Sequence, residues 1–132
     1  MKKQGLAILG STGSIGVQTL DIVRENPDLF EVVTLTANRN WELLARQAVE
    51  FDADSVVIAD ERFYTPLKEA LADSQIKVYA GENAVAEVPA NSNVDTVVNA
   101  LVGYAGMIPT VRSIENGKKV ALANKESLVV GG

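Results

Sequence analysis

The stretch GSTGSIG at residues 10–16 is the feature that most constrains the fold of this chain. It follows an apolar run at residues 6–9 and precedes an amphipathic segment at residues 17–24. This order is typical of a buried strand, a tight glycine turn and a helix. At such a turn the backbone can approach an anion closely, and the helix dipole favours negative charge. The segment therefore predicts a phosphate-binding strand–turn–helix unit, although the same glycines also suit a turn that only joins a strand to a helix.

The rest of the chain alternates short β-branched runs with helical patterns. We expect strands at residues 5–9, 30–36, 55–59, 76–79, 96–99 and 119–122. We expect helices at residues 14–26, 40–50, 61 or 65 to 71, 83–88 and 107–115. Nearly continuous apolar strands separated by helices predict a mainly parallel sheet with helices on both faces. Right-handed crossovers then give a Rossmann-like, doubly wound α/β fold, in which residues 1–132 form one domain.

The composition limits the chemistry that the chain can perform. It contains no cysteine and no histidine, so acid–base chemistry would have to use Asp, Glu, Lys or Tyr. The net charge is −5 and the basic residues are dispersed, which argues against nucleic acid as a partner. No apolar run reaches the length of a membrane span, and the first residues lack a leader pattern. We therefore expect a cytoplasmic protein that binds neither nucleic acid nor a membrane.

The segment after the second expected strand indicates which dinucleotide binds. An NAD site places a carboxylate there, about 20 residues beyond the glycine turn, to receive the ribose hydroxyls. Arg39 and Asn40 occupy this segment instead. A guanidinium binds the 2′-phosphate that a carboxylate would repel, and Asn40 can cap the next helix while donating to the same phosphate. We infer NADPH rather than NADH, with a solvated surface arginine as the alternative interpretation of Arg39.

A second group of polar residues follows the last expected strand. Asn124, Lys125 and Glu126 stand there, and ligands of open α/β sheets bind outside the carboxyl ends of the strands. We expect them to face the same crevice as Gly13, although an ordinary helix start also favours Asn and Glu. Residues 99–103, after the fifth expected strand, are candidates to contact the nicotinamide half of the cofactor, or they form only a glycine-containing loop.

Residues 10–16, 99–103 and 122–127 together resemble the 1-deoxy-D-xylulose 5-phosphate reductoisomerase family, in order and over essentially the whole chain. The Asn-Lys-Glu-Ser segment at 124–127 is the most specific part. The resemblance implies the amino-terminal, NADPH-binding domain of an enzyme that converts 1-deoxy-D-xylulose 5-phosphate to 2-C-methyl-D-erythritol 4-phosphate in non-mevalonate isoprenoid biosynthesis. It also implies a homodimer and a divalent metal, Mg or Mn, in the full-length enzyme.

The resemblance implies roles for individual residues. The residues that would hold the pyrophosphate region are Thr12, Gly13, Ser14 and Ile15. Those that would hold the adenosine 2′-phosphate side are Ala37, Arg39 and Asn40. Asn124 and Glu126 would complete the cofactor site, and Lys125 would contact the sugar phosphate substrate.

The acidic metal-binding segment of the family, and its catalytic and carboxy-terminal domains, do not occur within residues 1–132. We therefore expect an isolated cofactor domain that binds NADPH without turning over substrate. One alternative is the cofactor domain of another NADP-dependent Rossmann reductase, such as an aspartate-semialdehyde dehydrogenase or a dihydrodipicolinate reductase. Another is a noncatalytic nucleotide- or CoA-binding module. The Asn-Lys-Glu-Ser segment argues against the two reductases, and Arg39 distinguishes an NADP site from the noncatalytic module.

Overall fold

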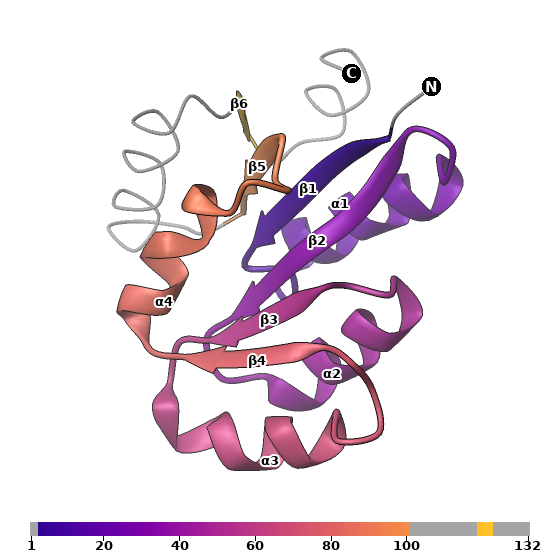
Figure 1. The fold of residues 1–132 in the computed structure, drawn as a ribbon. Coiled ribbons are helices and arrows are strands. Elements are labelled where there is room, and N and C mark those ends of the chain that lie inside the picture. Colours follow the sequence, from indigo (N-terminus) through magenta and orange to yellow (C-terminus); the bar gives the residue numbers. More distant parts are fainter. Residues whose placement is uncertain (1–2, 101–118, 123–132) are drawn as a thin grey trace.

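The computed structural model describes residues 3–100 and 119–122 of the chain (Figure 1). The strands are β1 (Gln4–Leu9), β2 (Phe30–Ala37), β3 (Ser55–Ile58), β4 (Lys77–Ala80), β5 (Thr96–Asn99) and β6 (Lys119–Leu122). The α-helices are α1 (Ser14–Glu25), α2 (Trp41–Glu50), α3 (Tyr64–Ala70) and α4 (Glu82–Glu87), and the 3₁₀ turns are η1 (Glu61–Phe63) and η2 (Val88–Ala90). All six expected strands are confirmed, and the expected helix at 107–115 lies outside the described residues.

The expected helix that begins at residue 61 or 65 divides into η1 and α3. Pro66 explains the division, because proline has no N–H and its ring clashes with the carbonyl four residues earlier. A continuous α-helix from residue 61 would place Pro66 against Arg62. With α3 starting at Tyr64, Pro66 lies in the first helical turn, where its missing N–H would have no partner in the helix.

The strands form one parallel sheet in the order β4-β3-β2-β1-β5-β6. The chain adds β2, β3 and β4 successively on one side of β1, and then returns to add β5 and β6 on the other side. The strand order therefore reverses beside β1. The parallel, doubly wound fold expected from the sequence is confirmed.

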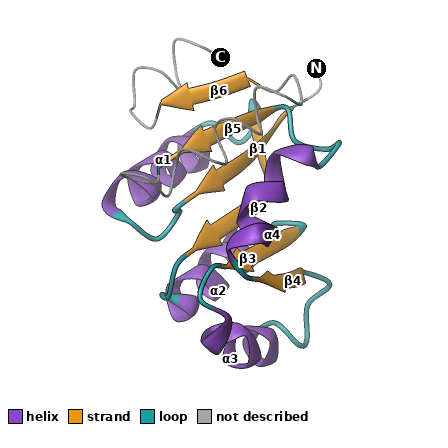
Figure 2. Ribbon diagram, turned by 90° about the vertical axis from the view of Figure 1, so that its left-hand side faces the viewer, coloured by secondary structure: helices purple, strands orange, loops and turns teal. Residues whose placement is uncertain are grey.

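Helices cover both faces of the sheet (Figure 2). Leu6 and Ile8 of β1 belong to the core on the face of α1, α2 and α3. Ala7 and Leu9 alternate with them and belong to a second core, which includes Val85 of α4. The change of face follows from the crossover rule: when the chain reverses its direction across the sheet, a right-handed connection must pass over the other face.

The carboxyl ends of the parallel strands share one edge of the sheet. In open α/β sheets, ligands bind at this edge where the strand order reverses, which here is the gap between the ends of β1 and β5. Among the described residues, none of the helices combines the length and apolar character needed to cross a membrane.

Candidate functional site

The glycine turn begins directly after β1, and two of its glycines are required by the backbone. Gly10 has φ of 80°, a conformation that residues with a Cβ rarely adopt. Gly16 lies in the first turn of α1, where an added Cβ would collide with the carbonyl oxygen of Gly10 and lie 2.6 Å from Ser11 Cα. These two glycines let α1 start immediately against the end of β1, so the turn stays tight.

Gly13 differs from both, because a Cβ there would meet only the Gly10 oxygen, at an ordinary distance of 3.7 Å. Gly13 is exposed and is the N-cap residue of α1, and no described side chain caps the helix. The first N–H groups of a helix have no partner within it, so an uncapped start attracts an anion. The open face at Gly13 therefore fits the close approach of a pyrophosphate.

The residues predicted to hold the pyrophosphate lie together at this helix start. Ser14 and Ile15 are exposed beside Gly13, and Thr12 is half-buried in the turn. Acidic side chains are absent from the first turn of α1, so no described carboxylate there repels a phosphate. Their contacts with a cofactor stay a prediction.

The residues predicted to hold the 2′-phosphate follow β2, the strand next to β1. Asn40 caps α2 as expected: its side-chain oxygen accepts from the Leu43 N–H at 3.3 Å. The Arg39 side chain is 68% exposed. Ala37 is different, because its side chain is buried in the core and its carbonyl accepts from the Ala59 N–H at 2.9 Å. The predicted contacts of all three residues with the cofactor remain untested.

A carboxylate also lies at this end of the site, on Asp60, two residues after the end of β3. Its Oδ2 atom lies 3.4 Å from Arg39 Nε and 2.6 Å from Arg62 Nη2. Hydrogen bonds from the Arg62 side chain lower the pKa of Asp60 to about 2. The sequence does not predict Asp60 or Arg62, since the expected position for an acidic residue was the end of β2. The sequence does hold a signal for both: the Asp-Glu-Arg run at residues 60–62 follows β3, which ends at the same edge of the sheet as β2.

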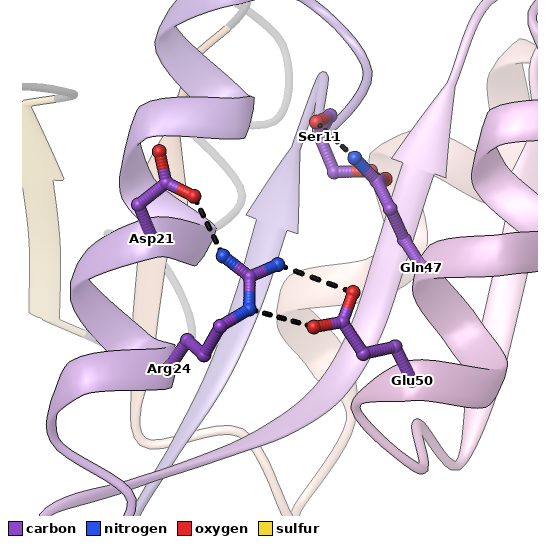
Figure 3. Close-up of polar contacts among 5 residues, drawn as sticks. All are labelled: Ser11, Asp21, Arg24, Gln47 and Glu50. Atoms are coloured by element: carbon purple, nitrogen blue, oxygen red, sulfur yellow. Dashed lines mark hydrogen bonds and ion pairs between the residues drawn. The ribbon is translucent and has the colours of Figure 1, made fainter.

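Hydrogen bonds join the glycine turn to β2 and to α2, and Figure 3 shows the contact between Ser11 of the turn and Gln47 of α2. The Gln47 amide nitrogen donates to the Ser11 carbonyl at 3.0 Å, and the Ser11 hydroxyl donates to Gln47 Oε1 at 2.8 Å. On β2, the Thr36 hydroxyl accepts from Gly10 N at 3.0 Å, and the Thr36 carbonyl accepts from Ser11 N at 2.9 Å. Buried polar networks whose members are satisfied rigidify a structure. We infer that this network sets the position of the turn.

Arg24 forms a second link between α1 and α2 (Figure 3). It contacts Asp21 and Glu50, each at 2.6 Å, and its hydrogen bonds lower the pKa of Glu50. These side chains are about half exposed, so the pairs contribute little stability. Arg24 and Glu50 also line a hollow of about 690 Å³ that includes Phe30 and Asp54, near the amino ends of β2 and β3. Because this edge is opposite the glycine turn, the hollow is not part of the candidate site.

The other predicted residues lie outside the part of the chain that the structure describes: Asn124, Lys125, Glu126 and residues 101–103. Ala100 donates from its N–H to the Leu9 carbonyl at 2.9 Å, so the start of the 99–103 segment adjoins the end of β1. β6 ends at Leu122, which pairs with Asn99 at the same sheet edge. Within the described ranges, no group of three or more Asp, Glu, His or Cys residues could hold a metal ion.

Comparison with known proteins identifies relatives along the whole chain. Residues 6–132 match the family model of 1-deoxy-D-xylulose 5-phosphate reductoisomerase. The reductoisomerase of Porphyromonas gingivalis (strain ATCC 33277) is 55% identical over 130 residues, and that of Phocaeicola vulgatus is 54% identical over 132. These alignments cover 98% and 100% of this chain. The chain spans about a third of the length of each relative, 34% in both cases.

Solved structures give the same result. The reductoisomerase from Zymomonas mobilis, solved in complex with NADPH, is 45% identical with a TM-score of 0.87, over 97% of this chain and 34% of that one. A second reductoisomerase, solved with NADPH, fosmidomycin and magnesium, is 38% identical with a TM-score of 0.86, over 96% of this chain and 31% of that one. Sequence, fold and glycine turn agree, and this chain belongs to the 1-deoxy-D-xylulose 5-phosphate reductoisomerase family.

Proposed function

We propose that this chain is the NADPH-binding part of a reductoisomerase that converts 1-deoxy-D-xylulose 5-phosphate to 2-C-methyl-D-erythritol 4-phosphate. The observation that carries the proposal is the open face of Gly13 at the uncapped start of α1, beside the point where the strand order reverses. Arg39 and Asn40 at the end of the adjacent strand support NADPH over NADH. The NADPH complex of the Zymomonas mobilis relative supports the same cofactor.

NADPH supplies a hydride for reduction when it is bound, and the residues of this chain hold and orient it. Backbone N–H groups at the start of α1 bind the pyrophosphate, with the hydroxyls of Thr12 and Ser14 beside them. The exposed guanidinium of Arg39 binds the 2′-phosphate with paired N–H donors. Asn40 caps the start of α2 and is exposed next to Arg39.

The contribution of Arg39 is tested by titrating the chain with NADPH and NADH, before and after Arg39→Ala. Loss of charged hydrogen bonds should weaken NADPH binding by about 1.5–3 kcal/mol, or roughly ten- to hundredfold in Kd, and leave NADH unchanged. Arg46→Ala is the matched control, because Arg46 is an exposed arginine on α2 that is not among the residues proposed to bind the cofactor. Equal affinity of the unmodified chain for the two cofactors would refute the proposal.

The properties of the whole protein are also proposals. The substrate is a sugar phosphate, and Lys125 contacts it. The magnesium and fosmidomycin bound to solved relatives support a metal and a small phosphate-like ligand in the complete enzyme. Among the described residues, no group of three or more acidic, histidine or cysteine side chains could hold that metal. We further propose that the complete enzyme is a homodimer, which light scattering would test. We also propose a cytoplasmic location, which cell fractionation would test.

A further inference from the structure

Arg39 is not alone at the 2′-phosphate end of the site, because it shares the carboxylate of Asp60 with Arg62. Both arginines contact the same oxygen, Asp60 Oδ2, at 3.4 Å from Arg39 Nε and 2.6 Å from Arg62 Nη2. The Asp60 side chain is 15% exposed, whereas the side chains of Arg39 and Arg62 are 68% and 72% exposed. The two guanidinium groups therefore lie on the solvent side of one partly buried anion.

Arg62 holds this carboxylate much more completely than Arg39 does. Its Nε atom donates to both Asp60 oxygens, at 3.0 and 3.2 Å, and its Nη2 atom donates to Oδ2 at 2.6 Å. Its backbone N–H adds a fourth hydrogen bond, to Oδ1 at 3.1 Å, because Asp60 is the N-cap of η1. The guanidinium also stacks over the Phe63 ring, at 5.7 Å from the ring centre. Arg62 thus has a fixed place beside Asp60.

Asp60 would otherwise oppose the binding of a 2′-phosphate. It is tied to the loop that carries Arg39, since the Asp60 N–H donates to the Asn38 carbonyl at 3.0 Å. An unpaired carboxylate at that place would repel the phosphate and would compete with it for the Arg39 guanidinium. A carboxylate already bound by another guanidinium does neither to the same extent.

We propose that Arg62 is a specificity-determining residue for NADPH, which occupies Asp60 and so leaves Arg39 available to the 2′-phosphate. The inference rests on the proposed NADPH function and extends it. It requires no direct contact of Arg62 with the cofactor. Removing Arg62 should weaken NADPH binding because it leaves the Asp60 carboxylate unpaired, so neutralising Asp60 should restore the affinity.

The test measures the Kd of NADPH, NADH and 2′,5′-ADP for four chains: unmodified, Arg62→Ala, Asp60→Asn and the double variant. Arg62→Ala should weaken NADPH and 2′,5′-ADP roughly three- to fivefold, the size of an exposed charge interaction, and leave NADH unchanged. The double variant should recover the unmodified affinity for NADPH to within about twofold, because substitutions of two residues in direct contact are coupled. Asparagine also caps helices, so Asp60→Asn preserves the start of η1. Arg46→Ala again controls for the loss of one positive charge.

The outcomes separate this inference from the proposed function. An unmodified chain that binds NADPH no better than NADH overturns both. An unmodified chain that prefers NADPH, with no effect of Arg62→Ala, overturns only the role of Arg62. A double variant as weak as Arg62→Ala also overturns it, because Arg62 would then bind the phosphate itself. Circular dichroism of each variant establishes that the fold is retained.

Discussion

Gln47 is the side chain on which the position of the glycine turn depends, and replacing it by leucine tests that dependence. Its side chain is buried, and it exchanges two hydrogen bonds with Ser11, which is fully buried. Leucine has a similar size but no polar atom. The Ser11 hydroxyl would keep a contact with the Thr36 carbonyl at 3.3 Å, whereas the Ser11 carbonyl would lose the donor at 3.0 Å.

The loss of stability comes from the Ser11 carbonyl, which would be left without a hydrogen-bond donor. A buried acceptor left without a partner destabilises a protein by about 1–3 kcal/mol. Leucine at this position would contact the neighbouring core around Leu44 and Ala48, which offsets a part of the loss. We expect the free energy of unfolding to fall by roughly 1–3 kcal/mol, with the urea midpoint lowered and the m-value unchanged. NADPH affinity should fall as well, because the turn proposed to hold the pyrophosphate would no longer be fixed.

Gln47→Glu tests the amide donor itself. A protonated carboxyl group can donate to the Ser11 carbonyl and accept from the Ser11 hydroxyl, as the amide does, whereas a carboxylate cannot donate. Burial raises the pKa of the introduced group above its unfolded value of about 4.3. The folded state then holds the proton more tightly, so the stability of this variant is retained below the unfolded pKa and lost as pH rises through the folded pKa.

Urea unfolding of this variant and of the unmodified chain, between pH 4 and pH 7, measures the effect. Gln18→Leu on the exposed face of α1 is the control for exchanging an amide for leucine. Stability curves of Gln47→Glu and the unmodified chain that stay parallel across this range would show that the Gln47 amide donor does not matter, and the explanation of the turn would be wrong.

Three further predictions concern the site. Gly16→Ala should destabilise the fold by roughly 1–3 kcal/mol through overpacking. Gly13→Ala should cost about 1 kcal/mol of stability or less, yet it should weaken NADPH binding more than tenfold because the added Cβ fills the open face of the turn. Calorimetric titration and thermal unfolding of both variants test this contrast. NADPH affinity should rise with pH through about 6, because the 2′-phosphate loses its second proton there. NADH affinity should stay constant, because the chain has no histidine and the pKa of Asp60 is about 2. Titrations from pH 5 to 8 in which the two cofactors showed the same pH dependence would contradict this prediction. This 132-residue chain spans about a third of the length of its relatives. It should bind NADPH but should not oxidise it when 1-deoxy-D-xylulose 5-phosphate and magnesium are added. The absorbance of NADPH measures its oxidation.

The sheet could be predicted from the sequence because its strands are short apolar runs separated by clear helix patterns. Even the division of the third expected helix has a local cause, which is Pro66. The cap of α2 was equally local, since Asn40 and Leu43 are three residues apart. Features of this kind depend on neighbours in the chain, and sequence patterns record them well.

Gln47 and Arg62 could not be predicted in the same way, because the role of each depends on contacts between elements that are far apart in the sequence. Gln47 looks like an ordinary polar residue of an amphipathic helix. The signal that could have marked it is its place among Leu44, Ala45 and Ala48 on the inner side of α2, where a glutamine must find a partner. Arg62 gains its importance only once β3 lies beside β2, which brings Asp60 to the loop that carries Arg39.

The two ends of the proposed cofactor site belong to different strand–helix units, yet one buried serine links both. Ser11, in the turn at the pyrophosphate end, is hydrogen-bonded to Thr36 and to Gln47. Arg39 and Asn40 lie between these two partners in the sequence, so the segment that would bind the 2′-phosphate is hydrogen-bonded to the turn before and after it. A site held in this way has less freedom to lose when a dinucleotide binds, which leaves more of the interaction energy as affinity. It also makes the two ends interdependent: a variant of Gln47 should weaken the binding of NADH as well as NADPH, whereas a variant of Arg39 should weaken NADPH alone.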